Sequence, residues 1–164
     1  MTDFFVELVK VDHAQKSVIE NLIQLYLYDM AAQAKFPLNA QGRYDYNFVD
    51  RFWEYPYLVR ADGEIAGFCM IISHCPIRER SPCWFMAEFC ILRPYQRAGV
   101  GRAAVSDVLK RHRGDWEISW DKKNGPAGKF WQNVVPDLNE THKVSFDGTD
   151  WVSLAFSARG PHKD

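Results

Sequence analysis

Two glycines stand between the apolar run WFMAEFCIL and the amphipathic segment AAVSDVL, in the stretch QRAGVGR. Gly99 and Gly101 therefore lie where a strand is expected to turn into a helix. The first N–H groups of a helix lack intrahelical acceptors and the helix dipole adds partial positive charge, so such a turn can bind an anion. Glycines let the backbone approach a phosphate closely, and Arg97 and Arg102 add flanking cations. The spacing suits a pyrophosphate, although glycines at such a turn are also ordinary loop chemistry.

Two common phosphate-binding motifs do not match this stretch. A P-loop requires Gly-Lys-Ser/Thr, whereas Arg102 and Ala103 follow Gly101 here. A dinucleotide-binding fingerprint requires a third glycine, where this chain has Ala104, and Asp121 does not supply the acidic residue expected further on. These two classes of phosphate site are therefore set aside for the glycines.

Aromatic residues gather before the central strands and invite a second chemical interpretation. A pocket for a cationic amine is one reading, and packing of the first helices onto the sheet is the other. The residues concerned are Tyr44, Tyr46, Phe48, Phe52, Trp53, Tyr55 and Tyr57.

Hydrophobic periodicity and turn residues predict the elements that must position these groups. The predicted elements are a strand in Met1–Val11, a helix over residues 14–33 with Asp12 as candidate N-cap, a loop with a short helix around Tyr46–Phe52, two strands flanking Ala61–Glu64, a strand at Cys83–Leu92, a helix at Val100–His112, a strand at residues 116–120, a helix at Pro126–Val134, and two strands at Thr141–Phe146 and Trp151–Phe156 joined through Asp147–Gly148. We expect Trp116 and Trp120, which alternate on one strand, to be core residues. The order indicates a mixed α/β (α+β) chain with antiparallel hairpins around a central β-α-β unit.

Length and composition favour one soluble domain spanning residues 1–164, since domains usually hold roughly 100–150 residues. With 47% hydrophobic residues the chain can bury a core, and its formal charge of -1 provides no global attraction to nucleic acid or membrane. The amino terminus lacks the pattern of a signal peptide, and no run is apolar enough to span a bilayer. We therefore expect a cytoplasmic protein.

The cysteines show no metal-binding spacing. Cys69, Cys75, Cys83 and Cys90 are widely spaced and form no CxxC pair. We expect reduced, mostly buried thiols and no metal site.

The segment ILRPYQRAGVGRAAVSDVL resembles the acetyl-CoA-binding motif of the GNAT superfamily of N-acetyltransferases. The motif is Q/R-x-x-G-x-G/A, matched by Gln96, Gly99 and Gly101. Downstream, NGPAGKFWQNV resembles a second family motif, and the predicted order of elements is similar to the family's fold. The resemblance extends over essentially the whole chain, with motifs between Glu88 and Trp131.

The resemblance implies a mostly antiparallel sheet with helices on both faces, splayed beside the strand that precedes the glycines. It implies that this strand pairs with the pantetheine arm of acetyl-CoA and that the loop amides bind the pyrophosphate. The implied cofactor-binding residues are Ile91, Leu92 and Arg93 for pantetheine, Gln96, Arg97, Ala98, Gly99, Val100, Gly101, Arg102 and Ala103 for the phosphates, and Asn124, Ala127, Phe130 and Trp131 in the second motif. The basic residues Lys110, Arg111 and Arg113 complement the helix dipole or reach the adenosine 3′-phosphate.

One position departs from the family. Many members have a tyrosine, which protonates the leaving thiolate, where this chain has Trp131. An indole N–H is not a comparable acid, so another tyrosine or solvent must serve, or turnover is weak. Tyr26, Tyr28, Tyr44, Tyr46 and Tyr95 are the tyrosines available.

Acetyl transfer to an amine also requires a group that accepts the amine's proton. Glu88 lies on the strand before the glycines, and burial would raise its pKa into a useful range. The alternative interpretations of Glu88 are a structural ion pair and a solvent-facing residue where the sheet splays. His74, more simply a surface residue, is a second candidate base. Tyr44 and Tyr46 are the expected substrate contacts.

The sequence thus predicts an N-acetyltransferase that moves acetyl from acetyl-CoA to a primary amine of a small molecule or protein in a ternary complex. The alternative is a GNAT-fold acyl-CoA-binding sensor with little turnover. A cofactor-free interaction domain would require both motifs to be accidental. A homodimer, formed through the carboxyl-terminal strands, is a further expectation.

Overall fold

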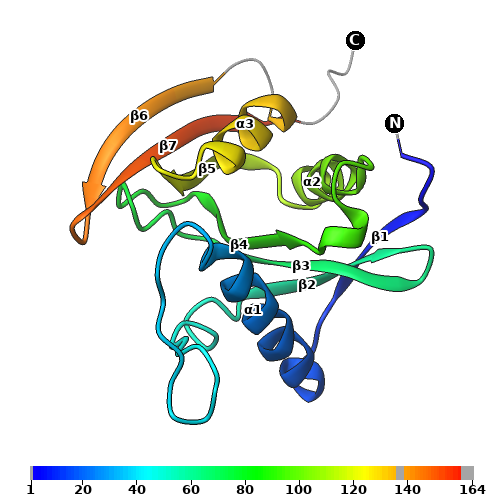
Figure 1. Ribbon diagram of the computed structural model, residues 1–164. Coiled ribbons are helices and arrows are strands. Elements are labelled where there is room, and N and C mark those ends of the chain that lie inside the picture. Colours follow the sequence, from blue (N-terminus) through cyan, green and yellow to red (C-terminus); the bar gives the residue numbers. More distant parts are fainter. Residues whose placement is uncertain (1, 136–138, 160–164) are drawn as a thin grey trace.

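A seven-stranded sheet runs through the molecule in the computed structural model, which describes residues 2–135 and 139–159. The strand order is β1-β2-β3-β4-β5-β7-β6, with α1 below the sheet and α2 and α3 above it in Figure 1. The elements are β1 (Val6–Lys10), α1 (Lys16–Met30), β2 (Tyr55–Ala61), β3 (Glu64–Ile72), β4 (Trp84–Ile91), α2 (Val100–Arg111), β5 (Gly114–Asp121), α3 (Gly125–Val134), β6 (Asn139–Phe146) and β7 (Thr149–Ala158). This confirms the predicted mixed fold with helices on both faces. Met1, where the first strand was expected to begin, lies outside the described residues.

Both predicted Asp-Gly hairpins form. Asp62 and Gly63 have φ angles of 51° and 83°, and Asp147 and Gly148 have φ angles of 50° and 73°. Two successive positive φ angles match the twist of antiparallel strands, which is why Asp-Gly is favoured there. The hairpins join β2 to β3 and β6 to β7.

The neighbouring strands β4 and β5 separate from each other after a short parallel contact. Only Trp84 with Trp116 and Phe85 with Glu117 are paired. Beyond these pairs β4 continues to Ile91 along β3, while β5 continues along β7. The result is a wedge between two half-sheets, as expected from the family resemblance.

The two faces of the sheet have separate cores. On the upper face in Figure 1, the side chains of Trp116, Ile118 and Trp120 pack in the cluster that includes the buried residues of α2. On the α1 face, Ile19 and Ile23 pack with Phe68, Met70 and Cys90. The prediction that Trp116 and Trp120 are core residues is confirmed, since they are 0% and 7% exposed.

The short helix expected around Tyr46–Phe52 is not formed. Residues 43–48 are irregular, and a series of turns follows from 49 to 54, with the Phe52 N–H bonded to the Phe48 carbonyl. The Tyr44 backbone instead pairs with the Gln24 side chain on α1. These contacts outweigh the local helical pattern of the segment.

The expectation of four reduced cysteines was wrong for two of them. Cys75 and Cys83 form a disulfide, whereas Cys69 and Cys90 are free and buried. Because β3 and β4 are antiparallel neighbours, their connection returns on itself and brings the two Cα atoms to 5.6 Å, within bonding reach. The spacing of eight residues along the chain does not reveal this proximity. Within the described ranges, no helix combines the length and apolarity needed to cross a bilayer.

Candidate functional site

The loop between β4 and α2 presents a group of unpartnered backbone N–H groups. Gly99 caps α2 with φ 79°, and Arg97 has φ 58°, an uncommon angle for a residue with a side chain. Such alternation of left-handed residues curls N–H groups into a concave anion site. In the described part of the chain, no hydrogen bond uses the N–H groups of residues 97–102, and the first bonded one is Ala103 to the Gly99 carbonyl. The loop therefore fits a pyrophosphate.

Gln96 ties this loop to the end of β4. Its Nε2 donates to the Ile91 carbonyl at 2.7 Å, while the Leu92 N–H donates to Ala66 on β3 at 2.8 Å. Because the peptide groups of a strand alternate in direction, those of Ile91 and Phe89 face the wedge. Phe89 is thus a wedge-facing residue that sequence reasoning missed, although two-residue alternation from Ile91 points to it.

Arg93, just after the end of β4, forms an ion pair with α1. Its guanidinium pairs with the Asp29 carboxylate near the end of α1, with Nη2 and Oδ1 at 2.7 Å. The side chain of Arg93 therefore fastens α1 to the strand end, and only its backbone is left for the expected role at the pantetheine arm.

Packing leaves little room for a side chain at Gly101. A Cβ atom at this position would lie 3.0 Å from the Phe130 ring and 3.5 Å from Ile91 Cγ1. The Phe130 ring in turn stacks on Phe89 at 5.5 Å between centroids. The glycine thus lets α2 approach α3 beside the wedge.

The second motif has structural roles in α3. The Asn124 Oδ1 accepts from the Ala127 N–H at 3.2 Å, which caps the helix. Trp131 is 6% exposed and packs on Phe89 and Phe130, with centroid distances of 5.1 and 4.9 Å. Ala127 and Phe130 are partly buried against the same core cluster. Trp131 is thus a core residue, and its indole does not take the place of a solvent-facing acid.

Glu88 lies at a β-bulge on the α1 side of β4. The register with β3 shifts between Met70 and Ile71, which leaves Ala87 without a partner and sets Glu88 opposite Met70. The Tyr46 hydroxyl donates to Glu88 Oε1 at 2.8 Å. Glu88 is half-buried, and the desolvation of its carboxyl group raises the pKa of Glu88 to about 7, against the opposing effect of the hydrogen bond from Tyr46 and of the nearby Tyr26 phenol. A carboxylate with such a pKa can accept a proton near neutral pH.

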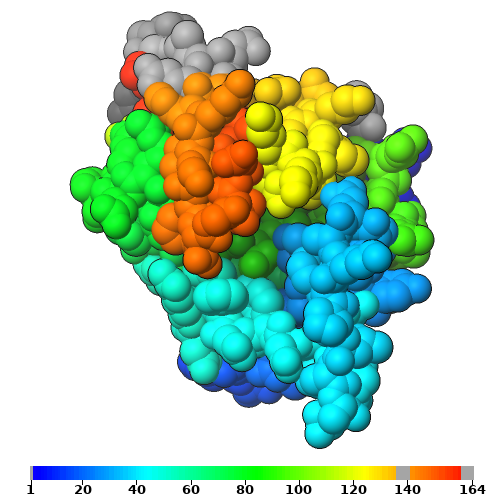
Figure 2. Space-filling view, turned by 60° about the vertical axis from the view of Figure 1, so that its left-hand side comes forward, coloured from blue at the N-terminus to red at the C-terminus, as the bar shows by residue number. Residues whose placement is uncertain are grey.

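The two tyrosines expected to contact substrate lie on the segment beside α1. The Gln24 side chain bonds the Tyr44 backbone with both of its amide atoms, at 2.8 and 2.9 Å, and the Tyr44 ring contacts Phe36. A cavity of about 450 Å³ between α1 and this segment is lined in part by Tyr44 and Tyr46. Figure 2 shows the surface hollowed between the β6–β7 hairpin, α3 and the cyan segment, with a floor in the green of β4. Because its hydroxyl donates to Glu88 Oε1, Tyr46 lies next to the candidate base as well as along this cavity.

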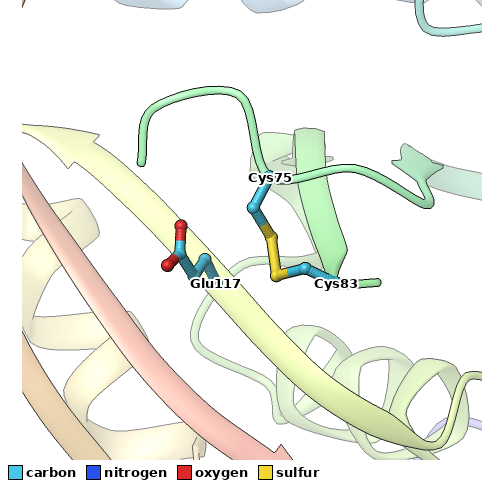
Figure 3. A group of neighbouring side chains, drawn as sticks. All are labelled: Cys75, Cys83 and Glu117. Carbon is cyan, nitrogen blue, oxygen red and sulfur yellow. A yellow bond between two sulfur atoms is a disulfide. The ribbon is translucent and has the colours of Figure 1, made fainter. Parts of the chain in front are cut away.

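A buried carboxylate lies at the point where the wedge closes. Glu117 on β5 is fully buried, and its Oε1 lies 3.2 Å from Arg80 Nη1 and 3.4 Å from Arg78 Nη1. Figure 3 shows Glu117 beside the Cys75–Cys83 disulfide, with which it forms a group of potential ligand atoms within 4.8 Å. The bonded sulfurs are not thiolates, and two guanidiniums already neutralise the carboxylate, so the donor set does not suit a cation. The cluster joins the β3–β4 connection to β5.

The remaining candidates are exposed or stand far from the first turn of α2. His74 is exposed on the β3–β4 connection, and Tyr28 is 67% exposed on α1. Lys110 and Arg111 stand at the carboxyl end of the 12-residue helix α2, roughly 15 Å from its first turn at 1.5 Å per residue. Arg113 follows that end. This distance does not favour the expected contact of these basic residues with the adenosine 3′-phosphate.

Comparison with known proteins agrees with this geometry. Residues 22–134 match the family model described as Acetyltransferase (GNAT) family. The fold is similar to an acetyltransferase from Thermus thermophilus, with a TM-score of 0.67 and 14% identity over 96% of this chain and 99% of that one. No curated relative matches the sequence.

Two further solved structures share the fold and carry substrate names. One is the ribosomal-protein-S18-alanine N-acetyltransferase from Escherichia coli, with a TM-score of 0.57 and 13% identity over 98% of each chain. The other is spermidine N-acetyltransferase from Vibrio cholerae in complex with CoA and spermine, with a TM-score of 0.59 and 12% identity over 93% of this chain and 95% of that one. At such identities the likeness is one of fold.

Proposed function

The chain belongs to the GNAT acetyltransferase family, and on this premise we propose that it is an N-acetyltransferase which moves the acetyl group of acetyl-CoA to a primary amine by direct attack in a ternary complex. The observation that carries the proposal is Glu88, a carboxyl with a pKa of about 7 set beside the wedge between β4 and β5. Acetyl-CoA supplies an activated acetyl group as a thioester.

The residues around the wedge fit acetyl-CoA. The N–H groups of residues 97–102 would bind the pyrophosphate, with Arg97 and Arg102 as flanking cations. The wedge-facing backbone of Phe89 and Ile91 would bind the pantetheine arm, and Phe130 would border it from α3. The unpaired stretch of β4 and the curled loop are the features that support this placement.

Glu88 then acts as the general base. An amine is protonated at neutral pH and attacks only after losing a proton, so a nearby carboxylate accelerates the reaction. The Glu88 carboxylate accepts that proton, directly or through water. A free backbone N–H on β4 polarises the acetyl carbonyl. As the amine nitrogen bonds to the acetyl carbon, the C–S bond of the thioester breaks, and the CoA thiolate takes its proton from solvent.

A second candidate function is favoured by one observation. Trp131 is a buried core residue at the position where many family members have an acidic tyrosine. A chain without that acid suits an acyl-CoA-binding sensor that binds the ligand and turns it over slowly. Thiol release therefore has to be measured separately from binding.

The acceptor, assembly and location stay predictions. The substrates named for two fold neighbours, spermidine and a ribosomal protein, agree with a small-molecule or protein amine. We propose a single domain over residues 1–164, a homodimer and a cytoplasmic location. The Cys75–Cys83 disulfide is more typical of oxidising compartments, so cell fractionation is a direct test of the location.

The deciding experiment combines calorimetry and kinetics. Acetyl-CoA and CoA should bind the purified chain, and thiol release should be detected across a panel of polyamines, amino acids and peptide amino termini. Glu88→Gln should bind acetyl-CoA as tightly as the unmodified chain but release thiol at least about a hundredfold more slowly, the range typical of a general base. Since the base must be ionised, kcat/KM should rise with pH around a midpoint of about 7.

The outcomes separate the two functions. Binding without thiol release for any amine would favour the sensor. No binding of either ligand at millimolar concentration would contradict both functions.

A further inference from the structure

We propose that Tyr46 and Tyr26 are positioning residues for the Glu88 carboxylate. Tyr46, in the segment after α1, holds the carboxylate by a direct hydrogen bond, and Tyr26, on α1, faces the same group and supports its ionised form. The inference rests on the proposed function, in which Glu88 is the general base. We call Tyr26, on α1, and Tyr46, in the segment that follows α1, the clamp of the candidate base.

The contact from Tyr46 spans 42 residues of sequence. Its hydroxyl donates to Glu88 Oε1 at 2.8 Å, the length of an ordinary O–H···O bond. The Tyr26 phenol also faces this carboxyl group and acts to lower the pKa of Glu88. The hydrogen bond from Tyr46 restricts the rotation of the carboxyl group, and the two phenols together stabilise its ionised form.

Gln24 fixes the segment that carries Tyr46. Its side-chain amide donates to the Tyr44 carbonyl at 2.9 Å and accepts from the Tyr44 N–H at 2.8 Å. This pairing resembles that of two strands and holds the Tyr44 backbone against α1. Tyr46, two residues further on, is thereby directed at Glu88, and Phe48 contacts its ring at 5.6 Å.

Tyr26 approaches from the body of α1. Its ring packs edge-on against Phe68 of β3, with a centroid distance of 6.0 Å. Burial first, and then the Glu88 charge, raises the pKa of Tyr26 well above its ordinary value. The phenol therefore stays protonated and remains a donor at every pH at which Glu88 titrates.

The other ionisable groups facing this carboxyl cannot replace the two phenols. Cys90, two residues along β4, has its pKa raised by burial to about 12 and is a neutral thiol. Asp29 of α1 is held by Arg93. From β3, the residue opposite Glu88 is the apolar Met70. The clamp is therefore made by Tyr26 and Tyr46.

A titration that needs no turnover tests the clamp. The carboxyl carbons of glutamate are labelled with ¹³C, and the Glu88 signal is identified by its loss in Glu88→Gln. Tyr46→Phe should raise the Glu88 pKa by about one unit, since a hydrogen bond to a charged group is lost. Tyr26→Phe should raise it as well, since the phenol that acts to lower this pKa is removed. The double variant should raise it further. Circular dichroism checks that each variant is folded. If one single variant does not fold, the other still tests the proposal, because the two tyrosines lie in separate segments of the chain.

The pH profile tests the consequence for the reaction. In Tyr46→Phe, kcat/KM should be about tenfold lower at pH 6 and return to within about twofold of the unmodified chain at pH 9, as expected when the pKa of the base rises by about one. Tyr28→Phe is the matched control, because it removes an exposed hydroxyl from α1 two residues from Tyr26. Its titration and profile should not change.

The outcomes distinguish this inference from the proposed function. An unchanged Glu88 pKa in both single variants and in the double variant overturns the clamp, as does an equal loss of rate at all pH values. If the unmodified chain acetylates no amine, the proposed function fails, and with it the assignment of the tyrosines to a base.

Discussion

At the scale of single residues, Trp131 separates this chain from the tyrosine pattern of many family members. Its ring is 6% exposed and packs on Phe89 and Phe130. We predict that Trp131→Tyr does not accelerate thiol release, because the new hydroxyl is placed among hydrocarbon. It should lower the free energy of unfolding by about 1–3 kcal/mol, from lost volume and an unpaired polar group. Urea denaturation and thiol-release kinetics check both effects. Trp131→Phe controls for volume alone, and a faster Trp131→Tyr variant would contradict the assignment of this residue to the core.

Arg102 lies in the first turn of α2, where a cation opposes the helix dipole. This placement is unfavourable for the helix alone and suits a bound anion. Arg102→Gln should weaken acetyl-CoA binding about threefold to tenfold at low salt and less at high salt, since screening reduces exposed charge interactions. Stability should be unchanged or rise by about 0.5 kcal/mol. Calorimetry at two ionic strengths measures the affinity. Lys110→Gln, at the other end of α2, removes an equal charge and should have no effect on binding; equal losses would argue against the loop as the phosphate site.

At the scale of elements, local patterns predicted what local patterns control. The Asp62-Gly63 turn requires two positive φ angles, and Asp-Gly is a residue pair that favours such angles. The position of the candidate phosphate loop was predicted in the same way, from glycines between an apolar run and a helix. In contrast, the contact of Tyr46 with Glu88 depends on how a 42-residue stretch returns to the sheet, which no local pattern encodes. The role of Phe89 required the direction of the β4 peptide groups, known only once the register with β3 is known. Sequence therefore predicted a candidate base and a candidate phosphate loop, but not the contacts that hold them in place.

The β3–β4 connection is the element in which the sequence prediction was wrong, and its disulfide has a measurable effect. Cys75 and Cys83 close a loop that carries Arg78 and Arg80 to the buried Glu117. Reduction should lower the free energy of unfolding by roughly 2–3 kcal/mol, the chain-entropy value for so short a loop. Urea denaturation with and without a dithiol reductant measures the loss. The Cys75→Ser/Cys83→Ser double variant should show no response to the reductant, and a response there would assign the effect to another group.

At the scale of the whole molecule, the candidate base is expected to reduce stability at the pH at which it works. Burial raises the pKa of Glu88 from its ordinary value of 4.5 to about 7. Below pH 4.5 the carboxyl is protonated in both folded and unfolded chains, so its full contribution to stability is present. As the pH rises to about 7 the unfolded chain releases this proton while the folded chain keeps it, so the contribution is lost. Above pH 7 the loss reaches up to about 3 kcal/mol, because a pKa difference of one between the folded and unfolded chains corresponds to about 1.4 kcal/mol.

Glu88→Gln keeps the shape and the acceptor oxygen but cannot ionise, so it should escape this loss. We predict equal free energies of unfolding for the variant and the unmodified chain near pH 4.5, and a more stable variant at pH 8, by up to about 3 kcal/mol. Urea denaturation across this pH range provides the measurement. Glu64→Gln, which removes an equal charge from an exposed position at the start of β3, should show no such divergence. A variant that is both more stable and inactive at pH 8 would mean that the fold accepts a buried carboxylate for the sake of the reaction, as expected where activity and stability compete. A variant less stable at pH 8 than the unmodified chain would instead assign Glu88 to a structural network and remove the main support for its role as a base.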